Sequence, residues 1–261
     1  MCHARGSCVH FSAEDEISNA GLPLGKKLSF FTPDSEYHGG PGAGFGIRHF
    51  SGGAIAERGQ SYEGQWKDDE QEGYGKLRTH AGTSYEGEWK AGEFHGEGTY
   101  VFQKYGKAEA SSVYAGQWSE GKKHGKGKLT LYSGNSYDGE WVQDKRDGWG
   151  LYTIANPTIG GLAAYEGEWV QDARTGRGIS KGYDGHLEIC TYKEGLRVGE
   201  GVRIVDESKL KKDDLKGPFA LHEGKLGEEI SLADAEAVAA SLGFKSLPTF
   251  PWPPAAAAAP A

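Results

Sequence analysis

The chain has 261 residues, of which 37% are hydrophobic and 42 are glycine, a mixture that argues against a thick three-layer core. The net charge of −8 comes from interspersed acids and bases, whereas a nucleic-acid-binding protein is expected to carry a basic face, so no nucleic-acid partner is predicted. Three cysteines and the lack of a run of 18 apolar residues predict a cytoplasmic protein without a disulfide framework or a membrane-spanning helix.

Residues 1–32 are predicted to form an N-terminal extension. Its apolar segment, residues 28–31, would cap the first strand that follows, because an exposed strand edge invites pairing with other chains. Cys2, His3, Cys8 and His10 could supply zinc ligands in principle. Their spacing matches no standard zinc site, so no metal site is predicted.

A repeat occupies residues 33–204. The pattern Tyr-x-Gly-x-Trp ends at Trp66, Trp89, Trp118, Trp141 and Trp169, and each Trp is followed at +7 and +9 by glycine. Tyr37 and Tyr192 stand in the Trp position of two weaker copies. The seven ring positions are spaced by 29, 23, 29, 23, 28 and 23 residues, which predicts about seven repeats with a longer junction at every second one.

Each repeat is predicted to be a β-hairpin. Tyr, Gly and Trp at alternate positions share one face of the first strand, and the residue at Trp+3 is always Gly or Asp, which indicates a turn at positive φ. The second strand carries the two glycines on one face. The predicted structural aromatic stripe consists of Tyr37, Tyr62, Trp66, Tyr85, Trp89, Tyr114, Trp118, Tyr137, Trp141, Tyr165, Trp169 and Tyr192.

We expect the glycines to leave room for an aromatic ring from the neighbouring hairpin. Buried rings contribute large areas, so one ring per strand could hold a thin sheet together. The opposite face carries acids on first strands, such as Glu86, and bases on second strands, such as Lys76. This arrangement predicts a ladder of ion pairs. A ligand-binding surface is the alternative use of that face.

The last 57 residues are predicted to close the array. Residues 205–230 form a degenerate closing unit with Leu221 at the ring position, and residues 231–243 form a helix that begins at Ser231 and ends at Gly243. The helix either caps the last hairpin or docks onto a partner. Residues 244–261 form an extended tail rich in Pro and Ala, in which Phe250 and Trp252 either dock onto a partner or lie back along the chain itself.

Two further patterns contain residue types that ligand sites use. Residues 40–46 are glycine-rich, but they lack the following Lys-Ser/Thr of a phosphate-binding loop and their glycines fall in the repeat register. A basic rim is the second pattern, and it could bind anionic lipid headgroups if stacking aligned the turns. An ordinary charged turn surface is the alternative. The candidate rim consists of Lys122, Lys123, Lys126, Lys128, Lys145, Arg146 and Arg174.

The repeat pattern resembles the MORN repeat (membrane occupation and recognition nexus), with five strong and two weak copies between about residues 33 and 204. The resemblance implies an all-β fold: an elongated, single-layer antiparallel meander of stacked hairpins, here with a short C-terminal helix and an extended tail. MORN proteins act as scaffolds in ciliary radial spokes and other cytoskeletal assemblies, as tethers near membranes, or as modules fused to enzymes.

The sequence therefore predicts a non-enzymatic scaffold, without cofactor or catalytic residues, that binds other proteins of a large cytoskeletal or ciliary (axonemal) assembly. The alternative is a peripheral membrane tether that binds anionic phospholipids through the basic rim. A regulatory subunit of an enzyme, or an enzyme without a recognisable catalytic motif, is a third hypothesis. Only about 57 residues follow the last repeat, too few for a lipid kinase or methyltransferase domain.

Overall fold

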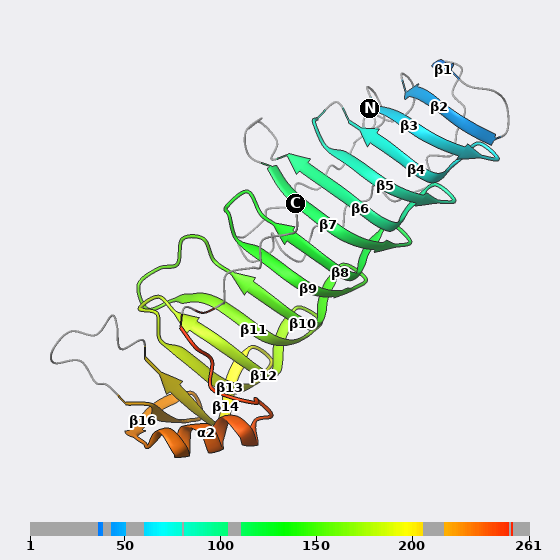
Figure 1. The fold of residues 1–261 in the computed structure, drawn as a ribbon. Helices are drawn as coiled ribbons and strands as arrows, with labels where there is room; N and C mark the ends of the chain where they lie inside the picture. The colour runs from blue at the N-terminus through cyan, green and yellow to red at the C-terminus, as the bar shows by residue number, and fades with distance from the viewer. Residues whose placement is uncertain are drawn as a thin grey trace, which may run out of the picture.

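The computed structural model describes residues 36–38, 43–50, 60–79, 81–103, 111–205, 217–250 and 252. These residues form a sheet of sixteen strands and one helix (Figure 1). The elements are β1 (Glu36–His38), β2 (Ala43–Phe50), β3 (Gln60–Lys67), β4 (Glu70–Arg78), β5 (Ser84–Lys90), β6 (Glu93–Gln103), β7 (Ser111–Ser119), β8 (Lys122–Thr130), β9 (Ser136–Val142), β10 (Lys145–Thr153), β11 (Leu162–Val170), β12 (Ala173–Gly182), β13 (Leu187–Lys193), β14 (Leu196–Ile204), β15 (Phe219–His222), β16 (Lys225–Glu229) and α2 (Leu232–Ser241).

The strands lie in the sheet in their order along the chain, and every neighbouring pair is antiparallel. The predicted all-β single-layer meander is confirmed. At about 4.8 Å between strands, the ribbon is roughly 70 Å long. The tight turns within hairpins line one long edge of the ribbon, and the connections between hairpins line the other (Figure 1).

The hairpin turns have a two-residue, left-handed backbone. In the turn between β5 and β6, Ala91 has φ 49° and Gly92, the Trp+3 residue, has φ 79°. Two consecutive positive φ values are the mark of a type I′ turn, whose twist matches that of the flanking strands. The same pair of values recurs at the other described hairpin turns from β3 onward, so the prediction of a positive-φ turn residue is confirmed.

The first glycine of each pair lies in a β-bulge. Gly96 has φ 52°, and the pairing of β5 with β6 shifts register beside it. The Glu88 carboxylate folds over the bulge and accepts a hydrogen bond from the Glu97 N–H at 3.1 Å. Gln65 and Gln117 occupy the same position in other hairpins and accept from the corresponding N–H groups at 2.7 and 2.9 Å. This glycine therefore supplies a backbone conformation.

In the five hairpins from β3 to β12, the second glycine of each pair lies under a ring. A Cβ on Gly98 would sit 2.3 Å from the hydroxyl oxygen of Tyr85, a residue of the same hairpin. The expectation of a ring from the neighbouring hairpin is wrong for the tyrosine, which lies over its own hairpin and donates to the Glu88 carbonyl at 2.8 Å. The neighbouring hairpin contributes its tryptophan instead: the Trp118 indole N–H donates to the Gly98 carbonyl at 3.1 Å.

The rings on this side of the sheet, the aromatic face, pack edge to face. The Tyr85 ring lies 5.2 Å from Trp89 of its own hairpin and 5.6 Å from Trp118 of the next, each at 90°. One cluster of buried residues unites the stripe from Tyr62 to Tyr192. Tyr37 lies in β1, but its side chain is outside the described residues. Because each ring contacts the next hairpin, stability is shared along the array.

The repeat pattern changes at the C-terminal end of the aromatic face. Cys190 replaces the usual glycine, and Glu188 is fully buried beside Arg197 and Arg203. Burial alone would raise the pKa of Glu188, but a hydrogen bond from His186 and the two guanidinium groups lower it to about 2. Leu221 takes the ring position in β15 and is buried in the cluster that contains the aromatic stripe. An ionic cluster and an aliphatic side chain thus replace the rings here.

Helix α2 packs on the opposite side of the sheet, which we call the outer face. The Ser231 hydroxyl accepts from the Asp234 N–H at 3.1 Å, so the helix begins as predicted. Ala235 and Ala239 are buried, whereas Leu232 is 62% exposed. The helix contacts β14 and joins a second apolar cluster on the outer face.

The tail follows the helix back across the outer face. Trp252 is 4% exposed and packs in the second cluster, and its carbonyl accepts from the Lys181 ammonium at 2.6 Å. Phe250 packs against the same cluster. Trp252 is therefore unsuited to partner docking, since the chain's own sheet buries its indole. The N-terminal extension, including Cys2, His3, Cys8 and His10, lies outside the described residues.

Candidate functional site

The outer face is divided into a covered part and an open part. Over β11–β14, α2 and the tail cover Ile179, Ile189 and Val202. Over β3–β9 no described segment packs against this face. Outward side chains there, such as those of Glu86, Thr99 and Gln117, are exposed. The open part is therefore a surface on which the described fold leaves side chains available to a partner.

Opposite charges pair across strands on the outer face, as predicted. Lys76 on β4 contacts Glu86 on β5, and the Lys128 ammonium lies 3.8 Å from Asp138. The hydrogen bond from Lys76 lowers the pKa of the Glu86 carboxyl, so this acid is ionised at neutral pH. Pairs this exposed contribute at most about 1 kcal/mol each. They fix the side chains in place more than they stabilise the sheet.

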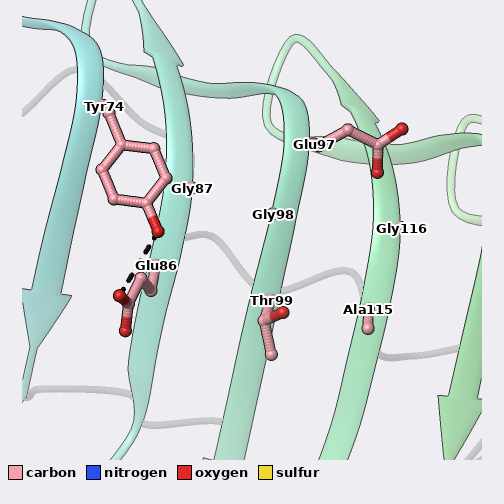
Figure 2. Close-up of a pocket in the computed structure, with 8 residues that line it drawn as sticks. All are labelled: Tyr74, Glu86, Gly87, Glu97, Gly98, Thr99, Ala115 and Gly116. Carbon is pink, nitrogen blue, oxygen red and sulfur yellow. Dashed lines mark hydrogen bonds between the residues drawn. The ribbon is translucent and has the colours of Figure 1, made fainter. Parts of the chain in front are cut away.

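The ion-pair ladder is interrupted between β6 and β7. Thr99 lies opposite Ala115 there, so two small uncharged side chains face each other. A shallow groove of about 440 Å³ lies over this gap and extends toward β4 (Figure 2). Its lining residues are Tyr74, Glu86, Gly87, Glu97, Gly98, Thr99, Ala115 and Gly116. We call this depression the Tyr74 groove.

The Tyr74 groove has an aromatic end and an acidic end. The Tyr74 ring is 55% exposed and lies toward β5, where its hydroxyl donates to Glu86 at 3.3 Å (Figure 2). Glycines form much of the floor, and the Glu97 carboxylate projects over the far side beside Gly116 (Figure 2). A ring, acids and a floor without side chains give a surface that can receive a cationic side chain.

A related groove of about 260 Å³ lies further along the outer face. Trp149 on β10 borders it, together with Lys126, Asp138 and Glu166. Beside this groove, the Arg177 guanidinium lies 5.7 Å from the centre of a Trp149 ring and donates to the Glu168 carboxylate at 3.1 Å. The chain thus seats one of its own arginines between a ring and an acid on this face.

The proposed basic rim is not assembled as one surface. Lys123 and Arg146 are 2% and 8% exposed and lie on the aromatic face, and the Arg174 guanidinium lies over Tyr165 and Tyr192. The physical reason is strand alternation, since each of these residues sits directly opposite a ring residue across its hairpin. Four exposed lysines remain, namely Lys122, Lys126, Lys128 and Lys145.

The inward-facing cations form a row on the aromatic face. The Lys123 ammonium lies 4.7 Å from a Trp141 ring, and the Arg146 guanidinium lies 4.1 Å from a Trp169 ring. Aspartates of the next hairpin turn balance their charge: Asp144 lies 4.0 Å from Lys123, and Asp172 accepts from Arg146 at 2.9 Å. These cations connect successive hairpins, so their role is structural.

Replacing Lys123 with methionine is expected to stabilise the protein. Burial lowers the pKa of Lys123 to about 8, although Asp144 opposes the shift. Because the folded pKa lies below that of the unfolded chain, holding the charge disfavours the folded state at pH 7, and this penalty disappears as the pH rises from about 8 to about 10.5. Methionine should add about 1 kcal/mol at pH 7.

Urea unfolding of the Lys123→Met variant and the parent at pH 7 and pH 10 measures this effect. The advantage of the variant should shrink at pH 10, where the parent lysine is neutral in the folded state. Tyrosine ionisation affects both proteins alike and cancels in the difference. A variant that loses stability at pH 7 would show that the Asp144 and ring contacts outweigh the cost of burial.

The sequence contains a signal for the groove residues that the repeat alone does not reveal. From Trp66 onward, the outer-face position eight residues after each ring residue varies instead of repeating: it is Tyr74, Glu97, Lys126, Trp149, Arg177 and Glu200 in successive hairpins. Structural repeats keep constant the residues that hold them together. A variable, outward-facing position is where recognition can differ between repeats.

The described residues contain no cluster of His, Cys, Asp or Glu arranged to hold a metal ion. Within the same residues, no helix has the length and apolar character needed to cross a membrane.

Comparison with known families identifies the repeat. A family model described as the MORN repeat matches residues 62–84, 85–107, 114–136, 137–156 and 165–187. These matches cover the five hairpins from β3 to β12 that carry both a tyrosine and a tryptophan. A search of the curated proteins finds no match to the chain.

Proposed function

Because the chain is a MORN-repeat protein, we propose that it is a non-catalytic scaffold that binds another protein on the outer face of β3–β9. MORN repeats mediate protein–protein or membrane–lipid interactions. The observation that carries the proposal is a contrast along the outer face. There α2 and the tail cover the C-terminal part, whereas none of the described segments covers the central part, which bears the Tyr74 groove.

A cytoplasmic protein of a cytoskeletal or ciliary assembly is the setting we propose. A ribbon roughly 70 Å long with one open face can contact an extended partner over many strands. The charge of the open face is mixed, and its ion pairs are exposed. Association through such a surface depends on charge complementarity, which favours specific recognition over simple apolar burial.

Site-specific photocrosslinking tests the proposal. A photoreactive phenylalanine analogue placed at Ala115, in the open part of the outer face, is expected to crosslink a partner protein in a lysate of cells that express the chain. The same analogue at Ser133, an exposed residue in the connection between β8 and β9, is the control. Crosslinks from Ser133 alone would place the binding surface elsewhere and refute the proposal.

Membrane binding is the alternative outcome. The four exposed lysines would then carry the interaction with anionic headgroups. Flotation with phosphatidylserine vesicles and with phosphatidylcholine vesicles separates the two. Charge reversal at Lys122 and Lys126 should abolish a lipid interaction and leave a protein crosslink from Ala115 unchanged.

A further inference from the structure

We propose that the Tyr74 groove binds an arginine side chain of a partner protein, with the guanidinium over the Tyr74 ring and an N–H donated to the Glu88 carboxylate. The inference rests on the proposed function and deepens it by naming the chemical group recognised. It comes from comparing two hairpins that carry the same kind of residues in different combinations.

The chain contains an occupied example of this site. Trp149 stands eight residues after Trp141, and Arg177 stands eight residues after Trp169, so they are equivalent positions in successive hairpins. Arg177 reaches back over the Trp149 ring at 5.7 Å while its Nε donates to Glu168 at 3.1 Å. The result is a cation held between an aromatic ring and an acid, both fixed by the sheet.

The Tyr74 groove has the same ring and acid but lacks the cation. Tyr74 is equivalent to Trp149, and Glu88 is equivalent to Glu168 because each immediately precedes a tryptophan. Glu97 occupies the position equivalent to Arg177, so this position carries a second acid instead of a cation. No cation of the described chain pairs with the Glu97 carboxylate, and the groove over Gly87 and Gly98 is left open.

The shape and charge of the groove select the occupant. The floor carries no side chains at Gly87, Gly98 and Gly116, so a long side chain can lie flat along it (Figure 2). Glu86 and Glu97 line the groove, and Glu88 on β5 is the cross-strand partner of Tyr74 on β4. The base Lys76 pairs with Glu86. A planar guanidinium matches the flat ring and the carboxylate geometry better than a compact ammonium does.

A titration followed by nuclear magnetic resonance tests the proposal on the full chain. The probe is the peptide acetyl-Gly-Gly-Arg-Gly-Gly-amide, with citrulline or lysine replacing arginine in two control peptides. Citrulline keeps the shape of arginine and removes its charge. The arginine peptide should shift the backbone amides of Gly87, Gly98 and Gly116, and the citrulline peptide should bind at least about fivefold more weakly.

Three variants assign the contacts. Tyr74→Leu removes the ring, and Glu88→Gln removes the acid while keeping the bulge hydrogen bond that Gln65 and Gln117 make in other hairpins. Each should weaken binding about threefold to tenfold. Glu97→Arg should abolish binding, because it supplies the missing cation from within the chain. Glu228→Gln, on the exposed strand β16, removes one negative charge elsewhere and should have no effect.

Shifts spread evenly over the acidic outer face, or a peptide affinity unchanged by Tyr74→Leu and Glu88→Gln, would overturn the arginine site. Crosslinking of a partner from Ala115 would still support the scaffold function in that case. Loss of the Ala115 crosslink with intact binding of the arginine peptide would refute the scaffold proposal while leaving the groove's chemistry in place. The two proposals therefore fail separately.

Discussion

Replacing Trp141 with alanine is expected to destabilise the protein by about 3–5 kcal/mol, since the change leaves a cavity that the rigid sheet cannot close. The Trp141 side chain is 1% exposed. Its ring lies edge to face 5.6 Å from Tyr114 and 5.0 Å from Tyr137, and its indole N–H donates to the Gly127 carbonyl at 2.9 Å. The substitution therefore removes contacts on both sides of the junction between two hairpins.

The position of Trp141 in the middle of the array gives a second expectation. Each hairpin contacts mainly its neighbours, so weakening one junction can let the two halves unfold separately. Urea unfolding followed by circular dichroism should show a lower midpoint and a broader transition. Trp141→Phe keeps a ring but loses the indole donor. The lost hydrogen bond should lower the free energy of unfolding by about 1 kcal/mol, and the smaller ring lowers it further because it makes fewer contacts.

Trp149→Ala is the matched control, since it removes a tryptophan from the neighbouring strand β10 but on the outer face, where the indole is only half-buried. Its cost should be clearly smaller than that of Trp141→Ala. Equal costs for the two variants would contradict the conclusion that the aromatic face holds the array together.

Replacing Gly98 with alanine is expected to cost about 1–3 kcal/mol by overpacking. The new Cβ would lie 2.3 Å from the Tyr85 hydroxyl oxygen and 2.5 Å from its Cζ, so the ring must leave its place. The hydrogen bond from Tyr85 to the Glu88 carbonyl would break as well. Gly98 has no positive φ, so the cost comes from the ring and not from the backbone.

A double-mutant cycle isolates this cause. In a Tyr85→Leu background the ring is absent, and Gly98→Ala should cost less than about 0.5 kcal/mol because the two residues no longer compete for space. Free energies of unfolding of the parent, the two single variants and the double variant provide the measurement. Additive costs would show that the glycine is required for some other reason.

Residues close in sequence determined the repeat unit. The turn, the bulge and the tyrosine over glycine all join residues within one stretch of about 23, and alternation along a strand sets the face of each ring. For example, Gly92 and Tyr85 could be assigned a turn and a buried face without coordinates. The hairpin array, the aromatic stripe and the ion-pair ladder were therefore predictable.

Contacts between distant residues were decided only by the tertiary structure. Arg177 donates to the Gly243 carbonyl, 66 residues away, and Lys181 to that of Trp252, 71 residues away. No repeat pattern encodes where α2 and the tail will lie, because their burial depends on apolar side chains that several strands bring together on the outer face. The same is true of the Tyr74 groove, whose ring and acids come from β4, β5 and β6 and meet only after the hairpins stack.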